Sequence, residues 1–560
     1  MFVSFATHRW VRPVLYPLLA AAVLATTGVA SAGSTERYEI LIVNGIVYDG
    51  TGAAPRHTDV GIKGGRIVTV DAPPDATARR RIDAAGRAVA PGFIDAHTHA
   101  PERVLQVAGR FIAPYLLAQG VTTMLIGADG GFSPAQLRGI MGVLATKGSA
   151  LNFGCYVGHN GIRREVMGGA ARGSSAAELD KMRELVREGM QFGCVGLSAG
   201  LMYEPGMFSG PDEIIALAKE VKSFGGTYDA HSRNPVIQFM SAETESIDIG
   251  AAAGIPAKLG HLKAVGLVNK GRSGEIIAAI DAARRLGREV VADMYPYDGA
   301  ATGPLREILM LERGEPTAAR PSLTQTQDRL RTIARDPAAI AALKAATENG
   351  IDGGFSMAKA VGYGSMRIVD APGRAELVGS NIELLARERR IDPFALIIDL
   401  VLGGPDLTIT VGAMDEADVQ NLLRQPWMMV ASDGFHVAAG ADNPGAHPRS
   451  TGTFTRVLGH YVRDVRLFPL EEAIRRMTSL PAEHLGLRDR GRIAPGYAAD
   501  VAIFDPKTVA DRSTYANPNA LSVGVSDVIV GGELVWENGA PTGATPGGFI
   551  PRQAYGPRLQ

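Results

Sequence analysis

The chain has 560 residues, and its 57 Lys and Arg against 58 Asp and Glu give a formal net charge of −1 at pH 7. That balance excludes the basic surface of a nucleic-acid-binding protein and the polybasic stripe of a membrane-surface protein. With this length and 46% hydrophobic residues, a globular chain with a large core and two structural units is expected.

The first 32 residues have the pattern of a secretory signal. Basic residues at 8–12 precede an apolar stretch at 14–30, and Ala30-Ser31-Ala32 has the small-x-small form that a signal peptidase accepts. We expect cleavage near Ala32 and a periplasmic or secreted mature protein with no stable membrane association. An uncleaved anchor is the alternative, although the apolar stretch is short for a membrane span.

Short β-strands are predicted near both ends of the mature chain. Residues 38–49 predict a hairpin with an Asn44-Gly45 turn, and residues 60–70 predict a second hairpin that turns at Gly64-Gly65. Residues 498–505 and 528–539 repeat the pattern. We therefore expect one small β-sandwich domain built from residues 33–90 and 490–560.

Strand and helix patterns alternate between these ends. Helical stretches at 175–192, 210–224 and 274–286 separate apolar stretches that predict strands. The eight candidate strands are residues 88–95, 120–127, 151–158, 194–198, 226–231, 256–261, 290–295 and 427–433. Eight such units predict an α/β fold, a TIM-like (β/α)8 barrel over residues 91–489. The extra helix and coil at about 304–400 predict an insertion over the barrel mouth, or a lid.

Histidines and aspartates gather at the predicted C-terminal strand ends, where such barrels place their active sites. Pro91-Gly-Phe-Ile-Asp-Ala-His-Thr-His99 carries two histidines two positions apart, so both imidazoles point the same way. The other titratable groups at strand ends are Asp129, His231, His261 and Asp433. Because four of the chain's 11 histidines fall at strand ends, the pattern favours one shared site.

Neutral imidazoles with a carboxylate suit zinc, and an open coordination position lowers the pKa of a bound water towards ~7. A carboxylate on the last strand, Asp433, can accept a proton from that water and pass it to a leaving amine. The pattern therefore predicts metal-assisted hydrolysis.

The chain resembles the amidohydrolase superfamily and, more narrowly, the D-aminoacylases (N-acyl-D-amino-acid deacylases). The first resemblance lies in the 91–99 nonamer. The narrower one lies in Gly158-His159-Asn160, Val166-Met167-Gly168, residues 196–206, His231-Ser-Arg233, His261-Leu-Lys263, Tyr295-Pro-Tyr297, Ser432-Asp-Gly434 and residues 447–459. The resemblance implies a zinc-dependent enzyme. Its substrates would be small molecules, N-acyl amino acids of D configuration, from which it removes the acyl group.

The resemblance also implies roles for single residues. His231 and His261 would belong to one tight zinc site, His97 and His99 to a neighbouring weaker one, and Asp433 would be the general acid and base. The substrate carboxylate would be held by Lys263 and Arg449, because Arg suits carboxylates, with a hydroxyl from Tyr203. Tyr297, which follows a predicted strand, is a further candidate for substrate binding. Alternatives stay open: Arg449 as a loop-tethering ion pair, Tyr203 as an ordinary near-surface aromatic, and Tyr295 facing the pocket in place of Tyr297.

One ligand departs from the family pattern. The family has a cysteine in a Gly-Asn-Cys-Gly turn after the second strand, whereas this chain reads Gly127-Ala-Asp129-Gly130. Asp129 can ligate or bridge zinc through oxygen, but oxygen is a harder ligand than sulfur and changes the metal preference. The alternative is a turn or helix N-cap role. The loop at 434–446 is also longer than the family pattern, which leaves the placement of Arg449 open.

Cys155 and Cys194 are the only two cysteines. They could pair in an oxidising compartment, but two cysteines do not make a disulfide framework. Their apolar, strand-like surroundings favour buried free thiols.

Other readings are weaker. Gly196-Leu-Ser198-Ala-Gly200 matches a serine nucleophile elbow, with Asp433 and His447 in the right order, but Pro205 and Gly206 oppose the helix that the elbow requires. A catalytically inactive barrel that acts as a binding module is supported only by the replacement of the family's cysteine by Asp129. A cyclic amidase of this superfamily would hold two metals with a carboxylated lysine on the fourth strand. The fourth predicted strand has no lysine, which argues against this activity. Dipeptide, ester and lactone substrates stay open.

Overall fold

The computed structural model describes residues 37–99, 109–311, 322–351, 356–435 and 447–553. The predicted signal sequence, residues 1–32, lies outside the described residues, as does most of the loop at 434–446. Among the helices that are described, none is long and apolar enough to cross a membrane.

A sheet of eight parallel strands forms the centre of the fold, in the order β17-β13-β12-β11-β10-β9-β8-β6. Their bounds are β6 (Phe93–Asp95), β8 (Val121–Ile126), β9 (Asn152–Gly158), β10 (Gly196–Gly200), β11 (Thr227–His231), β12 (Ala257–Leu259), β13 (Val290–Met294) and β17 (Met428–Val430). Every residue in them is buried, as expected for parallel strands covered on both faces. Each strand overlaps one predicted stretch, so the predicted (β/α)8 barrel is confirmed.

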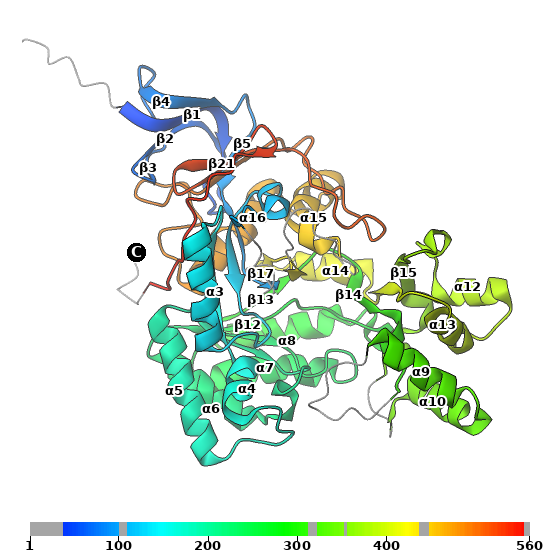
Figure 1. The fold of residues 1–560 in the computed structure, drawn as a ribbon. Helices are drawn as coiled ribbons and strands as arrows, with labels where there is room; N and C mark the ends of the chain where they lie inside the picture. The colour runs from blue at the N-terminus through cyan, green and yellow to red at the C-terminus, as the bar shows by residue number, and fades with distance from the viewer. Residues whose placement is uncertain (1–36, 100–108, 312–321, 352–355, 436–446, 554–560) are drawn as a thin grey trace, which may run out of the picture. The chain divides into compact units, whose positions relative to one another are not determined.

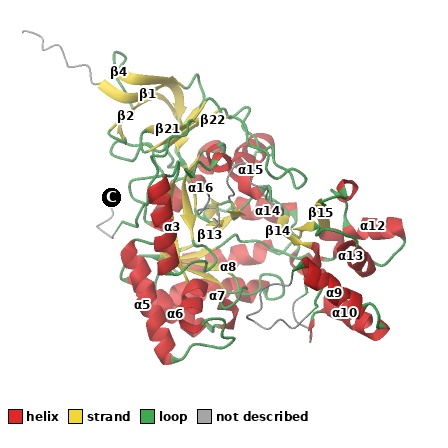
Figure 2. Ribbon diagram, in the orientation of Figure 1, coloured by secondary structure: helices red, strands yellow, loops and turns green. Residues whose placement is uncertain are grey.

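Helices surround the barrel strands (Figure 2). They are α2 (Pro114–Leu117), α3 (Pro134–Lys147), α4 (His159–Met167), α5 (Ala176–Phe192), α6 (Pro211–Lys222), α7 (Phe239–Ala253), α8 (Ser273–Arg285), α14 (Glu416–Leu423), α15 (Arg449–Arg456), α16 (Leu470–Met477) and α17 (Ser479–Leu485), with the π-helix η7 (Val457–Asp464) and the short 3-10 turns η1 (Gly206–Phe208) and η2 (Leu267–Asn269). Helix α5 shows why they form: Ser175 and Glu178 make a capping box at its start. Its buried Met182, Val186 and Met190 recur at helical spacing and face the core.

Strands from both chain ends share a second, mixed sheet, drawn in blue and red in Figure 1. Its order is β22-β21-β20-β19-β5-β1-β2-β3, with β4 also paired to β1. The bounds are β1 (Arg37–Val47), β2 (Arg56–Lys63), β3 (Arg66–Thr69), β4 (Thr77–Asp83), β5 (Ala88–Pro91), β19 (Val501–Phe504), β20 (Val525–Val530), β21 (Glu533–Glu537) and β22 (Ala540–Pro541). The predicted hairpin at Gly64-Gly65 joins β2 to β3 and is confirmed.

The hairpin predicted at Asn44-Gly45 is wrong. Strand β1 continues through these residues, where its register with β2 shifts and its parallel partner changes from β4 to β5. Asn44 has φ 56°, and a Cβ on Gly45 would lie 2.5 Å from the Cγ2 of Val89. The dipeptide therefore makes an irregularity inside a strand, where close approach of β5 demands glycine.

The stretch at 88–95, predicted as one strand, is divided between the two sheets. β5 ends at Pro91 and β6 begins at Phe93. Gly92 lies between them against Thr122, whose Cγ2 and Oγ1 would be 2.2 Å from an added Cβ. At the other chain end, residues 549–552 leave the mixed sheet: Ile550 N donates to Phe153 O on β9 at 2.8 Å.

An insertion interrupts the barrel between β13 and β17 and has its own hydrophobic core and sheet, in the order β14-β16-β15. It contains β14 (Gly299–Pro304), η3 (Leu305–Ile308), α9 (Leu323–Ile333), α10 (Pro337–Asn349), α11 (Met357–Val361), η5 (Tyr363–Ser365), β15 (Met366–Asp370), η6 (Ala375–Leu377), α12 (Ile382–Arg389), α13 (Pro393–Leu402) and β16 (Thr408–Gly412). It is wider than the predicted 304–400 because β14 and β16 pair at its base. Val236 and Val265, from loops after β11 and β12, join its core, so the insertion packs on two loops of the barrel mouth.

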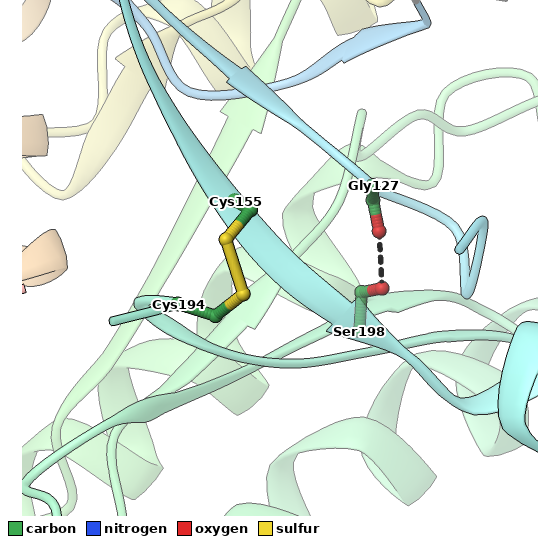
Figure 3. Close-up of a disulfide and its surroundings, with 4 residues drawn as sticks. All are labelled: Gly127, Cys155, Cys194 and Ser198. Atoms are coloured by element: carbon green, nitrogen blue, oxygen red, sulfur yellow. Dashed lines mark hydrogen bonds between the residues drawn. A yellow bond between two sulfur atoms is a disulfide. The ribbon is translucent and has the colours of Figure 1, made fainter. Parts of the chain in front are cut away.

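Cys155 and Cys194 form a disulfide, so the prediction of free thiols is wrong (Figure 3). Cys155 lies on β9 and Cys194 precedes β10, its neighbour in the barrel sheet. The parallel pairing of these strands brings the two Cα atoms to 4.7 Å, although 39 positions separate them in the sequence.

Candidate metal centre and active site

The six predicted centre residues all follow or end strands of the barrel. His231 is the last residue of β11, and His261 lies two residues after β12. His97 follows β6, while Asp129 and Asp433 each lie three residues beyond β8 and β17. His99 ends β7 (Thr98–His99), which pairs with β18 (Gly434–Phe435) and so ties the first barrel unit to the last.

Three of these residues form what we call the His231 half of the centre: Asp129, His231 and His261. His231 Nδ1 lies 2.7 Å from His261 Nε2, and Asp129 Oδ2 lies 3.3 Å from each of these nitrogens. All three residues are buried. Three donor atoms so close together, from two imidazoles and a carboxylate, match the donor set of a zinc site.

The His97 half contains His97, His99, Asp129 and Asp433. His97 Nε2 lies 3.3 Å from Asp129 Oδ1 and 3.6 Å from Asp433 Oδ1. His99 Nε2 lies 2.8 Å from Asp433 Oδ1 and 3.5 Å from Asp129 Oδ2. Asp129 therefore belongs to both halves, and its carboxylate stands between them.

The backbone around these residues is strained. Asp129, His261 and Asp433 have φ values of 54°, 35° and 48°, in the left-handed region that residues with a Cβ rarely adopt. Such conformations cost of order 1–3 kcal/mol and persist where surrounding contacts impose them, often at functional sites. Three of them around one centre indicate that the fold holds these side chains in place.

Two buried polar atoms that face the centre, Nε2 of His97 and Oδ1 of Asp129, have no hydrogen-bond partner among the described residues. Buried polar atoms normally find a partner, so a cluster of exceptions calls for an explanation such as an ion. Imidazole nitrogens and carboxylate oxygens around a common point would be satisfied by a divalent metal. The residues present fit such an ion.

The protonation of the centre also suits a cation. Burial and the nearby Lys263 ammonium lower the pKa of His261 to about 3, which keeps the ring in its neutral, metal-binding form. Burial alone would raise the pKa of Asp129, but the imidazoles of His261, His97 and His231 hold it well below its usual value. Asp129 is therefore a carboxylate.

Asp433 makes two charged contacts. Its Oδ2 pairs with Arg449 Nη1 at 2.7 Å, and its Oδ1 faces His99 at 2.8 Å. Burial opposes ionisation of Asp433, yet Arg449, His261 and His99 hold its pKa well below the usual value. The side chain is an oriented carboxylate beside the metal site, as a proton acceptor must be.

The predicted carboxylate-binding cations lie beside the centre. Lys263 Nζ lies 2.7 Å from His261 Nδ1, and burial lowers the pKa of this lysine to about 8. The guanidinium carbon of Arg449 lies 4.6 Å from the centre of the Tyr295 ring. Arg449 Nε is buried with no hydrogen-bond partner among the described residues, which leaves a donor for a ligand.

The two tyrosines after β13 separate. Tyr295 packs against Arg449, with Lys263 Nζ 5.6 Å from its ring centre. Tyr297 instead donates its hydroxyl to Asp511 Oδ2 at 3.1 Å and packs against Arg456. Tyr295, rather than the predicted Tyr297, is therefore the tyrosine that packs next to the two cations.

Tyr203 stands at the edge of the His231 half. Its hydroxyl lies 3.2 Å from His231 Nδ1, while the residue as a whole is 45% exposed. A side chain that touches the centre and also faces solvent is placed to contact an entering ligand. Asn160 supports its loop, because Asn160 Nδ2 donates to Gly200 O at 2.9 Å and to Tyr203 O at 3.3 Å.

Ser198 has a structural role, which removes the serine-hydrolase reading. Its Oγ donates to Gly127 O, drawn in Figure 3, and accepts from Gly130 N at 3.0 Å. It thereby fastens the turn that carries Asp129. Strand β10 continues to Gly200 and no helix starts after the serine, as a nucleophile elbow would require.

Sequence reasoning missed a buried charged layer under the centre, made of Asp229, Lys258 and Asp293. A signal was present: these are charges inside strand patterns that are otherwise apolar, and Asp229 lies two positions before His231 on the same strand. Residues two apart on a strand share a face, so Asp229 points into the barrel with His231.

Comparison with known proteins finds relatives over most of the chain. Residues 80–536 match the amidohydrolase family. D-Aminoacylase of Alcaligenes xylosoxydans xylosoxydans is 31% identical over 546 residues, which cover 94% of this chain and 100% of that protein. A D-aminoacylase structure that addresses its binuclear metal centre has a TM-score of 0.73 and 32% identity over 92% of this chain and 100% of that one. N-Acyl-D-glutamate deacylase of Bordetella bronchiseptica, solved with zinc and a phosphonate mimic of the tetrahedral intermediate, has a TM-score of 0.72 and 30% identity, with the same coverage.

Proposed function

The chain belongs to the amidohydrolase family, and we propose that it is a zinc-dependent hydrolase that removes the acyl group from N-acyl-D-amino acids. One observation carries the proposal. Four histidines and two aspartates from distant strands converge in two donor groups that share Asp129, in a chain similar over its whole matched length to deacylases of N-acyl-D-amino acids.

Zinc would be held by His231, His261 and Asp129 in the tight site, with His97 and His99 available to a second ion. When bound, the ion supplies Lewis acidity that polarises the acyl carbonyl and lowers the pKa of water at the site. His261 stays neutral, because burial and the Lys263 ammonium lower its pKa to about 3, so its ring nitrogen can serve as a donor.

Asp433 is the proton carrier of the proposed reaction. Its carboxylate accepts a proton from the attacking water and then donates that proton to the nitrogen of the breaking amide bond. The products are a free carboxylic acid and an amine, and Asp433 returns to its ionised form. Arg449 and His99 fix the two oxygens of Asp433, so one of them faces the centre in both steps.

Arg449 and Lys263 bind the substrate's carboxylate. Both cations are buried, and Arg449 Nε has no partner among the described residues. A carboxylate that accepts from this nitrogen satisfies a buried donor, which favours binding. Tyr295 stacks on the guanidinium and limits its movement.

The experiment is hydrolysis of a panel of N-acyl D- and L-amino acids by the purified protein, with zinc measured in the same sample. We expect release of free amino acid from the D series and loss of turnover with a chelator, restored by zinc. A protein that holds zinc but cleaves only dipeptides, esters, lactones or cyclic amides would refute the substrate class. A protein without zinc that still hydrolyses the panel would refute the mechanism.

We also propose that the protein is exported. The signal-like pattern at residues 1–32 and the disulfide between Cys155 and Cys194 support this, because disulfides persist in oxidising compartments. Cell fractionation, with the amino-terminal sequence of the recovered protein, tests it. Intact protein that begins at Met1 in the cytoplasm would contradict the proposal.

A further inference from the structure

Three charged residues lie inside the barrel, directly below the metal centre, and the proposed reaction uses none of them. They are Asp229 on β11, Lys258 on β12 and Asp293 on β13, each with an exposed fraction of 0%. Barrel interiors are usually filled by branched apolar side chains. Burying a charge costs several kcal/mol even when it is paired, so the presence of this layer calls for an explanation.

The layer is one connected ion cluster. Lys258 Nζ lies 3.1 Å from Asp229 Oδ1 and in contact with Asp293 Oδ2. It also donates to the carbonyl oxygen of Ala96 at 3.2 Å. One ammonium and two carboxylates leave a net charge of −1, and the ring of His97 lies directly against this excess.

Asp293 joins this cluster to two of the metal-centre histidines. Its Oδ1 accepts the backbone N–H of His261 at 2.5 Å, and its Oδ2 lies 3.6 Å from His97 Nδ1. The first contact matters because His261 has a φ of 35°, a conformation that needs external support. The second contact faces the ring nitrogen of His97 that points away from Asp129 and Asp433.

We propose that Asp293 is a positioning residue that fixes both halves of the metal centre, with Lys258 as its clamp. This inference rests on the metal centre of the proposed function. Asp293 favours the His97 tautomer that carries its hydrogen on Nδ1, which leaves Nε2 as the donor towards the centre. It also holds the backbone of His261, so one carboxylate aligns one histidine from each half. Carboxylates behind metal-binding histidines act in this way.

Two double variants that each retain a single carboxyl group test the proposal. Lys258→Met with Asp293→Asn retains only Asp229, and Lys258→Met with Asp229→Asn retains only Asp293. Both variants remove the ammonium and one carboxylate, so they are matched in composition. The measurement is the zinc dissociation constant by chelator competition, with circular dichroism and thermal unfolding as tests of folding. We expect the variant without Asp293 to bind zinc about 10–100-fold more weakly, and the variant without Asp229 to stay within about threefold of the wild type.

The single variants D293N and D229N repeat the contrast with Lys258 in place, and they serve if a double variant does not fold. Equal zinc affinities in either folded pair would show that the layer acts only through its charge and would overturn the proposal. Failure of the proposed function would give a different result, because the wild-type protein itself would then bind no zinc. At saturating zinc, we expect D293N to have the KM of the wild type and to recover part of the wild-type kcat. A variant whose site had collapsed would recover neither value.

Discussion

The two histidines of the His231 half stand on adjacent strands, β11 and β12, whereas His97 and Asp433 of the His97 half follow the first and last strands, β6 and β17. Asp129, which follows β8, belongs to both halves. In the His231 half, two imidazole nitrogens lie 2.7 Å apart with Asp129 beside them. In the His97 half, Asp433 lies between His99 and Arg449. The first half presents only donors for a metal, while the second also presents an oriented proton acceptor and a cation.

This difference indicates a division of labour. We expect the His231 half to hold the ion, because its two histidines stand on neighbouring strands of one continuous sheet. We expect the His97 half to carry the chemistry, because Asp433 contacts both His99 and Arg449 there, beside the β7-β18 pairing. Variants should therefore separate into those that lose metal and those that lose turnover.

The largest effect is expected from Asp433→Asn. The amide cannot accept a proton, so kcat should fall by about 10³–10⁴-fold, while zinc content stays that of the wild type. Steady-state kinetics and metal analysis of one sample provide the measurement. Asp511→Asn is the matched control, since Asp511 also pairs with an arginine, Arg456, but lies outside the two donor groups. Loss of zinc from D433N would show that metal binding and turnover are not divided between the two halves.

His261→Ala should abolish tight zinc binding, whereas His99→Ala should keep it. His261 contributes a donor to the His231 half, and its loss leaves two donors where structural and catalytic zinc sites need at least three. We expect extensive dialysis to remove zinc from H261A and to leave about one equivalent in H99A. The reverse order of retention would show that the His97 half is the tight site.

Arg449→Ala should mainly raise KM, by about 10–100-fold, because a charged hydrogen bond to a buried carboxylate is worth ~1.5–3 kcal/mol. Arg456→Ala, on the same helix but paired with Asp511, is the control and should leave KM unchanged. Part of the effect will appear in kcat, since Arg449 also orients Asp433. An effect on kcat alone would exclude carboxylate binding by Arg449.

The sequence predicted the barrel and its rim because carboxyl ends of parallel strands must meet, whatever their separation along the chain. It did not predict what depends on distances within the barrel. In the sequence, the buried Asp293 and Lys258 appear only as interruptions of apolar strands. The pairing of Cys155 with Cys194 requires their two strands to be neighbours in the sheet, and spacing along the chain does not reveal which strands are neighbours. Likewise, Asn44-Gly45 has the composition of a turn, yet the partners of β1 keep it in a strand.

The smallest effect, and the one that tests the boundary between the halves, is expected from Asp129→Cys. Asp129 supplies one oxygen to His97 and the other to His231 and His261, so it belongs to both halves. A thiolate is a softer ligand and should favour Zn²⁺ and Cu⁺ over harder ions, with a change in Zn²⁺-to-Mn²⁺ selectivity of about tenfold. Chelator competition with each metal measures it. Replacement of zinc by Co²⁺ adds a direct readout, because only a coordinated thiolate gives sulfur-to-cobalt charge-transfer absorption. Its appearance in D129C, with both histidine pairs intact, would place residue 129 in the coordination sphere, and its absence would return Asp129 to the role of a turn residue.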